Sequence, residues 1–278
     1  MAYNLLNNKK GIIFGALDEN SIAWQVALKA HEEGAKFVLT NSPVALRKGD
    51  IYKLAEICGN AQVIGADVTS IEDLTALFGS SMEVLGGKLD FILHSVGMSP
   101  NVRKGLDYME LDYDYFMKTI DISAMSLHKV LATAKKFDAL NEWGSVVTLS
   151  YIASQRTYAS YSDMAQAKAM LESIVRSFGY HYGRYNNVRV NSVSQSPTLT
   201  TAGTGVTGFN AFYSYAQCMS PLGNASSKEC ADYCVTLFSD LTRKVTMQNL
   251  FHDGGYSNMG ISERLITDCF SCQGNCQE

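Results

Sequence analysis

Short apolar runs alternate along this chain with longer segments in which apolar residues recur at helical spacing. The alternation is typical of parallel strands joined by covering helices, because a parallel connection must return the chain to the sheet edge where it started. The apolar runs lie at 11–15, 36–40, 62–66, 89–94, 145–150, 188–193 and 247–251, and helical stretches at about 21–33, 45–57, 71–85 and 113–138. The pattern predicts one α/β domain over residues 1–278, a doubly wound sheet of seven parallel strands with helices on both faces.

The composition supports a folded chain and argues against two classes of partner. The 278 residues are 46% hydrophobic and 18% charged, which allows a sizeable core, and the formal net charge is −4. This charge gives no reason to expect nucleic acid or an anionic membrane surface. No run approaches the roughly 20 apolar residues that span a bilayer, and the N-terminus does not read as a secretory signal. We therefore expect a cytoplasmic protein with neither nucleic acid nor membrane as a partner.

The seven cysteines do not suggest a metal site. Four of them fall in segments that read as helical, where a thiol behaves as a small apolar residue; they are Cys58, Cys218, Cys230 and Cys234. The other three, Cys269, Cys272 and Cys276, have no fourth ligand nearby, which favours an oxidisable tail over a zinc site. We expect no bound metal, and we treat about 262–278 as a separate tail that its position and composition allow to be flexible.

Tyr161 and Lys168 are separated by six residues, so a helix would place them almost two turns apart on one face. An ammonium beside a phenol is expected to lower the pKa of the phenol, which would suit Tyr161 to hydrogen-bond and protonate a developing oxyanion. A second phenol, Tyr151, directly follows the apolar run at 145–150. Because the chain holds 15 tyrosines, such a pair also arises by chance, and the other strand ends must decide its meaning.

The ends of three strands offer groups that a dinucleotide could use. Gly15 permits a tight turn, and a helix beginning near Ser21 would present N–H groups to a pyrophosphate, although the G-x-G-x-x-G fingerprint is absent and Ser21 also reads as a simple N-cap. Asp67 could accept from an adenine amino group or cap a helix. His94 reads best as an interior histidine, and Gly97 as either a plain turn or a wall against a cofactor.

The segment from Ser194 to about Gly208 is rich in Ser, Thr and Gly and lacks helical periodicity. It follows a strand, at the edge of the sheet where open α/β folds bind ligands. We therefore expect a substrate-binding loop over about 194–220 that can act as a lid.

Together these features resemble the enoyl-acyl-carrier-protein reductases of bacterial fatty-acid synthesis, the divergent branch of the short-chain dehydrogenase/reductases. Ordinary short-chain dehydrogenases use Tyr-x-x-x-Lys, but none of Tyr151, Tyr158 and Tyr161 has a lysine four residues further on. The resemblance covers about 10–259. It rests on Gly15-Ala16, Ser21-Ile22-Ala23, Asp67-Val68, His94-Ser95-Val96-Gly97, Leu149-Ser150-Tyr151, Tyr161 with Lys168, Val188-Arg189-Val190-Asn191 and Asp253-Gly254-Gly255.

The resemblance implies a Rossmann-type enzyme that reduces the C2=C3 bond of trans-2-enoyl thioesters on acyl carrier protein, using NADH, as a homotetramer. It implies that Tyr161 contacts the thioester carbonyl, that Lys168 holds the nicotinamide ribose and that Tyr151 flanks the substrate. Ser99 and Met164 would join the two tyrosines in binding substrate. The cofactor would be bound by Lys168 with Gly15, Ser21, Ile22, Ser42, Asp67, Val68, Ser95, Val96, Gly97, Thr198, Leu199, Thr200, Thr201 and Ala202.

The chain departs from the family pattern in two places. Gln195 and Ser196 stand where small residues are more usual, beside the nicotinamide end of the cofactor. The second strand ends in Thr40-Asn41-Ser42, which has neither the acidic residue that favours NAD nor a basic pair for a 2′-phosphate. NADH is the favoured cofactor, and NADPH is the second choice.

Two other functions compete with this interpretation. A carbonyl-reducing short-chain dehydrogenase of the 3-oxoacyl reductase type is opposed by the six-residue spacing between Tyr161 and Lys168. A non-catalytic dinucleotide-binding sensor is opposed by the presence of both tyrosines and the lysine, because a binding protein needs no proton donor.

Overall fold

The sheet is formed by parallel strands in the order β3-β2-β1-β4-β5-β6-β7. The computed structural model describes residues 2–47, 50–206 and 208–267. The chain reverses its direction of travel across the sheet between β1 and β4, which makes their adjoining ends the switch point of a doubly wound fold. The predicted sheet is therefore confirmed. The strands are β1 Lys10–Phe14, β2 Lys36–Asn41, β3 Val63–Gly65, β4 Leu89–His94, β5 Leu140–Ser150, β6 Arg189–Gln195 and β7 Asn249–His252.

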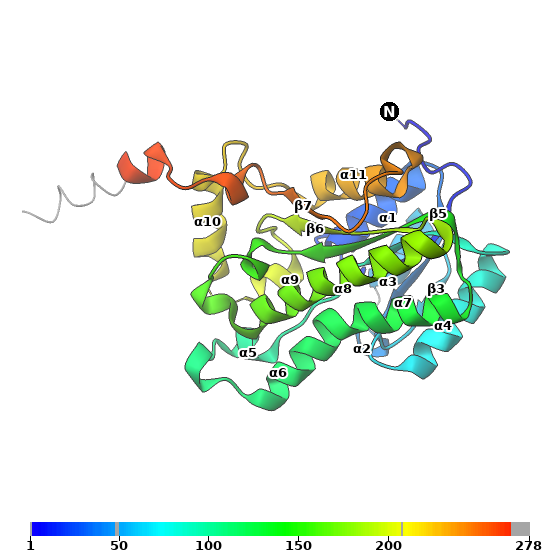
Figure 1. Ribbon diagram of the computed structural model, residues 1–278, viewed down its shortest axis with the longest axis horizontal. Coiled ribbons are helices and arrows are strands. Elements are labelled where there is room, and N and C mark those ends of the chain that lie inside the picture. Colours follow the sequence, from blue (N-terminus) through cyan, green and yellow to red (C-terminus); the bar gives the residue numbers. More distant parts are fainter. Residues whose placement is uncertain (1, 48–49, 207, 268–278) are drawn as a thin grey trace, which may run out of the picture.

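Helices cover both faces of the sheet, with α1 and α11 on one side and α4, α7 and α8 on the other (Figure 1). Short helices gather beyond the carboxyl ends of the strands, since α5 follows β4 and α9 follows β6. The helices are α1 Ile22–Glu32, α2 Pro43–Leu46, α3 Asp50–Ile57, α4 Ile71–Leu85, α5 Pro100–Lys104, α6 Tyr113–Ile120, α7 Ser126–Lys136, α8 Ser162–Asn186, α9 Thr201–Thr204, α10 Phe209–Met219 and α11 Ser227–Phe238.

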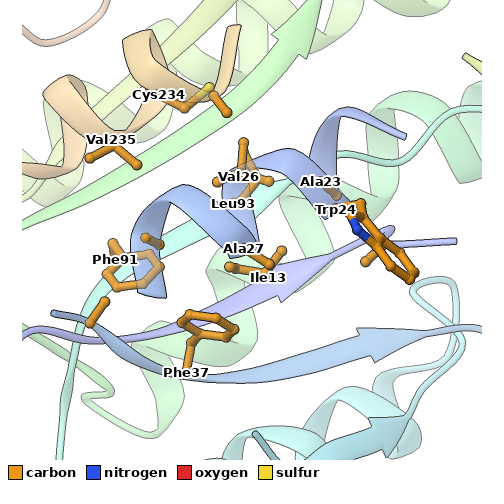
Figure 2. Packing of buried hydrophobic residues seen from close by; sticks show 14 of the residues in the cluster. Ile13, Ala23, Trp24, Val26, Ala27, Phe37, Phe91, Leu93, Cys234 and Val235 are labelled. Atoms are coloured by element: carbon orange, nitrogen blue, oxygen red, sulfur yellow. The ribbon is translucent and has the colours of Figure 1, made fainter. Parts of the chain in front are cut away.

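A hydrophobic core lies on each face of the sheet, and successive residues of a strand belong alternately to one core and the other. Ile13 and Leu93 pack with α1 and α11, whereas Ile12 and Ile92 pack with α4, α7 and α8. Figure 2 shows the first of these cores, in which small residues on α1 let the helix lie close to the strands. Gly11 serves the same packing, because a Cβ there would lie 2.4 Å from the buried ring of Phe91. These tight contacts fix β1 against β4.

The long helical stretch predicted at 113–138 is not continuous. A π-helical turn, Asp121–Met125, separates α6 from α7. Within it, Ser123 Oγ accepts from Met98 N at 3.0 Å and donates to Met98 O at 3.1 Å, so the turn is docked on the segment that follows β4. The interruption is a tertiary feature, because the sequence on both sides keeps its helical periodicity.

Other boundaries differ modestly from the sequence prediction. The expected helix at 45–57 is split into α2 and α3, and β5 begins at Leu140, five residues before the run at 145–150. This extension carries an irregular register against β4, and Asn141 Nδ2 donates to Asp90 Oδ1 at 3.0 Å there. This polar contact between β4 and β5 could not be predicted from the pattern of apolar residues.

The cysteines lie largely where the sequence placed them. Cys230 and Cys234 are buried in α11, Cys218 lies in α10, and Cys58 is buried one residue after α3 ends. The remaining three, Cys269, Cys272 and Cys276, lie outside the described residues, as does most of the tail expected at 262–278. Among the helices that the structure describes, none has the length and apolar character to cross a membrane.

Candidate active site

Tyr161 and Lys168 are brought together by the start of α8, although not as two residues of one regular helix. Tyr161 ends a 3₁₀ turn and stands at the N-cap of α8, while Lys168 lies within it. Ser162 between them has φ 48°, an unusual backbone angle for a residue with a side chain. Tyr161 and Lys168 therefore do not lie on one face of a single helix, contrary to the prediction. The 3₁₀ turn that leads into α8 sets the position of Tyr161.

Burial controls the protonation of both groups. It raises the pKa of the Tyr161 phenol above its ordinary value, so the expected lowering by the neighbouring ammonium is wrong. The physical reason is that burial removes the water that would stabilise the phenolate. Burial also lowers the pKa of Lys168 to about 8, with the Glu172 carboxylate acting in the opposite sense. At neutral pH the site holds a neutral phenol beside an ammonium.

Lys168 and Tyr151 are linked through the end of β5. Lys168 Nζ donates to Leu149 O at 2.8 Å, two residues before Tyr151. The Tyr151 and Tyr161 rings lie edge to face with their centroids 5.1 Å apart. The three predicted catalytic groups therefore form one cluster, drawn from β5, the turn at Tyr161 and α8.

A buried carboxylate holds the backbone that carries Tyr151. Glu172 Oε1 accepts from Ser150 Oγ at 2.6 Å and from Ser154 Oγ at 2.5 Å, and its Oε2 accepts from Gln155 Nε2 at 3.2 Å. Glu172 lies one helical turn beyond Lys168, so α8 supplies both the ammonium and the anchor of the adjacent loop.

Gly97 faces the cluster from the end of β4. A Cβ built on Gly97 would lie 3.7 Å from Lys168 Nζ, 3.9 Å from Ser123 Oγ and 4.0 Å from Met164 Cε. Met164 in turn belongs to an apolar cluster with Val102, Ala167, Ile120, Tyr161 and Val206. The predicted substrate residues Met164 and Tyr161 thus share an apolar wall next to the lysine.

Ser99 lies in a buried polar network. Its side chain is buried, its Oγ donates to Asp163 Oδ1 at 2.6 Å, and it accepts from Val102 N at 3.0 Å as the N-cap of α5. Asp163 also accepts from Asn101 Nδ2 at 2.7 Å and Thr119 Oγ1 at 2.9 Å. The Ser99 hydroxyl is therefore part of a buried network beneath the start of α8, and its place in substrate binding stays a prediction.

The first turn is shaped for close approach. Gly15 has φ 94°, and a Cβ there would lie 1.9 Å from Ser95 O, so only glycine fits between the ends of β1 and β4. Ser21 Oγ donates to Asp18 O at 2.8 Å and accepts from Leu17 N at 3.3 Å. The Ser21 hydroxyl thus braces the turn, and the N–H groups at the start of α1, from Ile22 on, keep their helix-terminal polarity for an anion.

The ends of β2 and β3 carry polar groups toward the same edge. Asp67 Oδ1 accepts from Thr69 N at 2.8 Å and Thr69 Oγ1 at 2.7 Å, so this carboxylate braces a turn rather than capping α4. Val68 packs against the α4 side of the core, as does Val96 after β4. Ser42 is partly buried and caps α2 through Ala45 N at 3.3 Å.

The loop after β6 folds back over the first turn. Thr201 Oγ1 donates to Asp18 Oδ2 at 2.5 Å, which joins α9 to the turn between β1 and α1. Thr200 caps α9 by accepting from Gly203 N at 2.9 Å, and Leu199 is exposed. Thr198 Oγ1 donates to Ser196 O at 2.9 Å. The segment expected to be a loop over about 194–220 therefore contains two helices, the short α9 (Thr201–Thr204) and the longer α10 (Phe209–Met219).

Three side chains near the site were not identified from the sequence. Asn41 Nδ2 donates to Ala16 O at 2.9 Å and so joins β2 to the first turn. Asp163 organises the network below Tyr161, and His252 Nδ1 donates to Gln195 Oε1 across 2.7 Å. Only Asp163 had a usable signal, since an acidic residue in the first turn of a helix favours the dipole.

His94 is an interior histidine, as its sequence context favoured. Its Nδ1 lies 3.0 Å from Thr148 Oγ1 and its Nε2 lies 2.9 Å from Ser126 Oγ. Burial, with the Lys168 charge as a smaller cause, lowers its pKa to about 3. His94 is therefore a neutral structural group that packs behind the lysine.

These residues fit a nicotinamide dinucleotide. Glycine at positions 15 and 97 keeps side chains away from the ends of β1 and β4, and a buried ammonium stands beyond Gly97. Ser194 Oγ, at the end of β6, is buried and among the described residues has no hydrogen-bond partner. A polar ligand across these strand ends would use the backbone room, the charge and the free hydroxyl together.

The chain is similar to reductases of known kind over nearly its whole length. A profile of the family described as enoyl-(acyl carrier protein) reductase matches residues 15–257. An NADH-type enoyl-[acyl-carrier-protein] reductase of Rickettsia bellii is 36% identical over 265 residues, covering 95% of this chain and 99% of the relative.

Solved structures agree with the sequence matches. The crystal structure of a FabI–NADH complex from Alistipes finegoldii is 64% identical with a TM-score of 0.93, over 94% of this chain and 92% of the other. The Bacillus cereus enoyl-acyl carrier protein reductase with NADP⁺ and an indole naphthyridinone is 32% identical with a TM-score of 0.86, over 94% of this chain and all of the other. The fold, the matched profile and these relatives show that the chain belongs to the enoyl-(acyl carrier protein) reductase family.

Proposed function

We propose that this protein reduces the C2=C3 double bond of trans-2-enoyl thioesters carried by acyl carrier protein, with NADH as the reductant. Family membership supports the reaction, and the relatives named as NADH enzymes support the cofactor. The observation that carries the proposal is the convergence of Tyr151, Tyr161 and Lys168 beside Gly97. The reaction is the last reductive step of fatty-acid elongation.

Tyr161 is the proposed hydrogen-bond donor to the substrate carbonyl. NADH, when bound, supplies a hydride to the β-carbon, and negative charge then develops on the thioester oxygen. A neutral phenol in an apolar wall is placed to stabilise that charge, because it can donate without first losing its proton. Tyr151 flanks the same position, 5.1 Å from Tyr161 between ring centroids.

Lys168 is assigned to the nicotinamide ribose. Its Nζ donates one hydrogen to Leu149 O and has two more that it can donate to ribose hydroxyls. Since the side chain is buried, its charge acts in a setting of low polarity and orients the ligand strongly. The ammonium also adds positive potential where oxyanion character develops.

The remaining cofactor contacts follow the strand ends. Gly15, Ser21 and Ile22 would receive the pyrophosphate, and Asp67 Oδ2 would accept from the adenine amino group while Oδ1 stays on Thr69. Asn41 and Ser42 offer no positive charge at the adenine ribose, which is consistent with NADH in preference to NADPH. The other residues in this set are Val68, Ser95, Val96, Thr198, Leu199, Thr200, Thr201 and Ala202.

The wider organisation belongs to the same proposal. We infer one catalytic domain with a substrate loop over about 194–220, working in the cytoplasm as a homotetramer with acyl carrier protein as the partner. The Thr201 contact to Asp18 supports a loop that excludes water from the cleft when it closes. Light scattering coupled to size-exclusion chromatography measures the oligomeric state directly.

The function is tested by following absorbance at 340 nm with crotonyl and longer trans-2-enoyl thioesters, with NADH and NADPH in separate reactions. We expect turnover with NADH, and a faster rate on carrier-bound than on free thioester. Oxidation of NADH with a 3-oxoacyl thioester but not with an enoyl thioester would establish the carbonyl-reducing alternative. Tight NADH binding with no turnover on either substrate would establish the sensor.

A further inference from the structure

A buried carboxylate lies next to the turn that carries Tyr161. Asp163 is the second residue of α8, and its side chain is fully buried. Its Oδ1 accepts from Ser99 Oγ at 2.6 Å and its Oδ2 accepts from Asn101 Nδ2 at 2.7 Å. These donors are neutral side chains from the start of α5. Because a buried charge is costly unless it is hydrogen-bonded, both bonds matter to the fold.

The hydrogens that the start of α5 brings to this carboxylate are all accounted for. Ser99 donates its one hydrogen to Asp163, and its oxygen accepts from Val102 N at 3.0 Å. Asn101 donates one amide hydrogen to Asp163 and the other to Asp112 O at 3.1 Å, and its oxygen accepts from Asp112 N at 3.2 Å. Each bond therefore has a single direction, and the carboxylate is held in one position.

Asp163 is anchored directly after a strained point of the backbone. Only Ser162 separates Asp163 from Tyr161, and its φ of 48° is unfavourable for a residue with a side chain. Such an angle persists only where the surrounding structure imposes it. Tyr161 N donates to Tyr158 O at 3.0 Å before this point, and the bonds to the Asp163 carboxylate hold the chain after it. Loss of the carboxylate would let the turn relax and move Tyr161.

The same bonds support the apolar wall against which Tyr161 packs. Helices α5 and α6 lie against α8 (Figure 1). Val102 of α5 belongs to the apolar cluster that contains Met164 and Tyr161. Val102 N also donates to the Ser99 hydroxyl, which in turn donates to Asp163. The carboxylate therefore fixes both the turn before α8 and one side of the pocket for the Tyr161 ring.

We propose that Asp163 is a positioning residue, which binds the start of α5 to the first turn of α8 and so holds the Tyr161 hydroxyl at the substrate carbonyl. Asp163 acts through Tyr161 and not by contact with the substrate. A displacement of a reacting group by about 1 Å can cost on the order of 10²-fold in rate, so such an anchor affects catalysis strongly. The inference rests on the proposed enoyl reduction and deepens it.

Two substitutions of Asp163 provide the first test. Asp163→Ala removes the anchor and should lower kcat on the order of 10–10²-fold, measured well below the Tm of the variant, with unchanged NADH affinity. Asp163→Asn should keep kcat within about threefold of the wild type, because its amide can accept from Asn101 and donate to the Ser99 oxygen. Unchanged kcat in Asp163→Ala would overturn the assignment.

The decisive measurement is a double-mutant cycle with Tyr161→Phe, followed in both kcat and Tm. Adding Asp163→Ala to Tyr161→Phe should cause little further loss of kcat, because the hydroxyl that Asp163 positions is already absent. The Tm should fall as far as it does in the single Asp163→Ala variant. An equal loss of kcat in both backgrounds would overturn the assignment, as would a lowered Tm with no loss of kcat in either.

Ser99→Ala keeps the proposal testable if Asp163→Ala does not fold. It removes one donor to the carboxylate and should lower kcat about fivefold, the effect of one lost hydrogen bond, only where the Tyr161 hydroxyl is present. Ser239→Ala is the matched control, since this buried serine likewise donates one hydrogen bond and accepts one as a helix cap; it should lower Tm and leave kcat unchanged. A loss in Ser99→Ala that persists without the Tyr161 hydroxyl would overturn the assignment. Wild-type protein inactive on every enoyl thioester would instead refute the proposed function, so the two failures are distinguishable.

Discussion

Lys168 Nζ donates to the main-chain oxygen of Leu149 across 2.8 Å, which fixes the ammonium of α8 to the end of β5. The bond uses a carbonyl at the end of the strand, just before Tyr151. A cofactor bound by Lys168 and a substrate flanked by Tyr151 would therefore both be positioned by the same short stretch of backbone at the end of β5. The relative position of cofactor and substrate would then depend on the backbone at the end of β5.

Replacing Lys168 should act mainly on the cofactor. Lys168→Ala is expected to weaken NADH binding by at least tenfold and to abolish turnover at ordinary NADH concentrations, since a buried charge-assisted contact is removed. Fluorescence titration with NADH measures the affinity. Lys36→Ala, on the exposed start of β2, should leave affinity unchanged. NADH binding at wild-type strength in Lys168→Ala would remove the ribose assignment.

The pKa of Lys168 predicts how NADH binding depends on pH. Because burial lowers that pKa to about 8, the ammonium is present below pH 8 and is lost as the pH rises through that value. The affinity of the free protein for NADH should therefore fall with an inflection near pH 8, whereas an unperturbed lysine would titrate near 10.5. The weak residual binding of Lys168→Ala should lack this inflection, and a flat wild-type profile would contradict the prediction.

Tyr161→Phe should separate chemistry from cofactor binding. The hydroxyl is proposed to meet only the thioester oxygen, so kcat is expected to fall on the order of 10²–10⁴-fold while the affinity for NADH is unchanged. Single-turnover kinetics measure the chemical step. Tyr113→Phe, at an exposed position on α6, is the control. Near-full activity in Tyr161→Phe would transfer the donor role to Tyr151.

Gly97 should tolerate a methyl group better than a larger side chain. A Cβ there would touch Lys168 Nζ at 3.7 Å and Met164 Cε at 4.0 Å, which are ordinary contacts, so Gly97→Ala should retain substantial activity. The additional methyls of Gly97→Val would enter the space between these groups. We expect the KM for the enoyl thioester to rise more than the Kd for NADH, and equal effects on both would contradict the proposed pocket.

The loop after β6 should close through Thr201. Thr201→Val removes the hydroxyl that binds Asp18 and keeps the shape of the residue, so NADH should dissociate several-fold faster, in proportion to one lost hydrogen bond. Hydrogen exchange of 194–206 should be fast in the free protein and slow with cofactor and substrate analogue together. High protection before ligand is added would show that the loop is not a lid.

The sequence predicted the sheet well because strand and helix periods depend on neighbouring residues. The number of strands, the β4 boundaries and the α4 boundaries follow from apolar spacing and turn residues alone. The break between α6 and α7 was not predicted; Ser123 within it is hydrogen-bonded to Met98, a contact between segments that no local pattern encodes. Side chains from distant strands decide such details.

The sequence predicted which residues form the site better than it predicted their protonation and their hydrogen-bond partners. The cluster of Tyr151, Tyr161 and Lys168 is present, but the pKa of Tyr161 moves upward because the protein removes water from the phenol. The Ser99 hydroxyl donates to the buried carboxylate of Asp163, a contact that the sequence did not predict. The burial of a side chain depends on the whole folded chain, and the spacing of residues along the sequence gives little information about it.

The strand order has a consequence for how the protein is made. β1 lies between β2 and β4, so until synthesis has passed His94 the nascent chain carries β1 as an open edge. The boundary between β1 and β4 is also the one beside which Gly15 and Ser95 lie, where the dinucleotide would bind. A ligand held across this boundary stabilises the joined halves by mass action. The stability of the folded chain would then rise with the concentration of NADH.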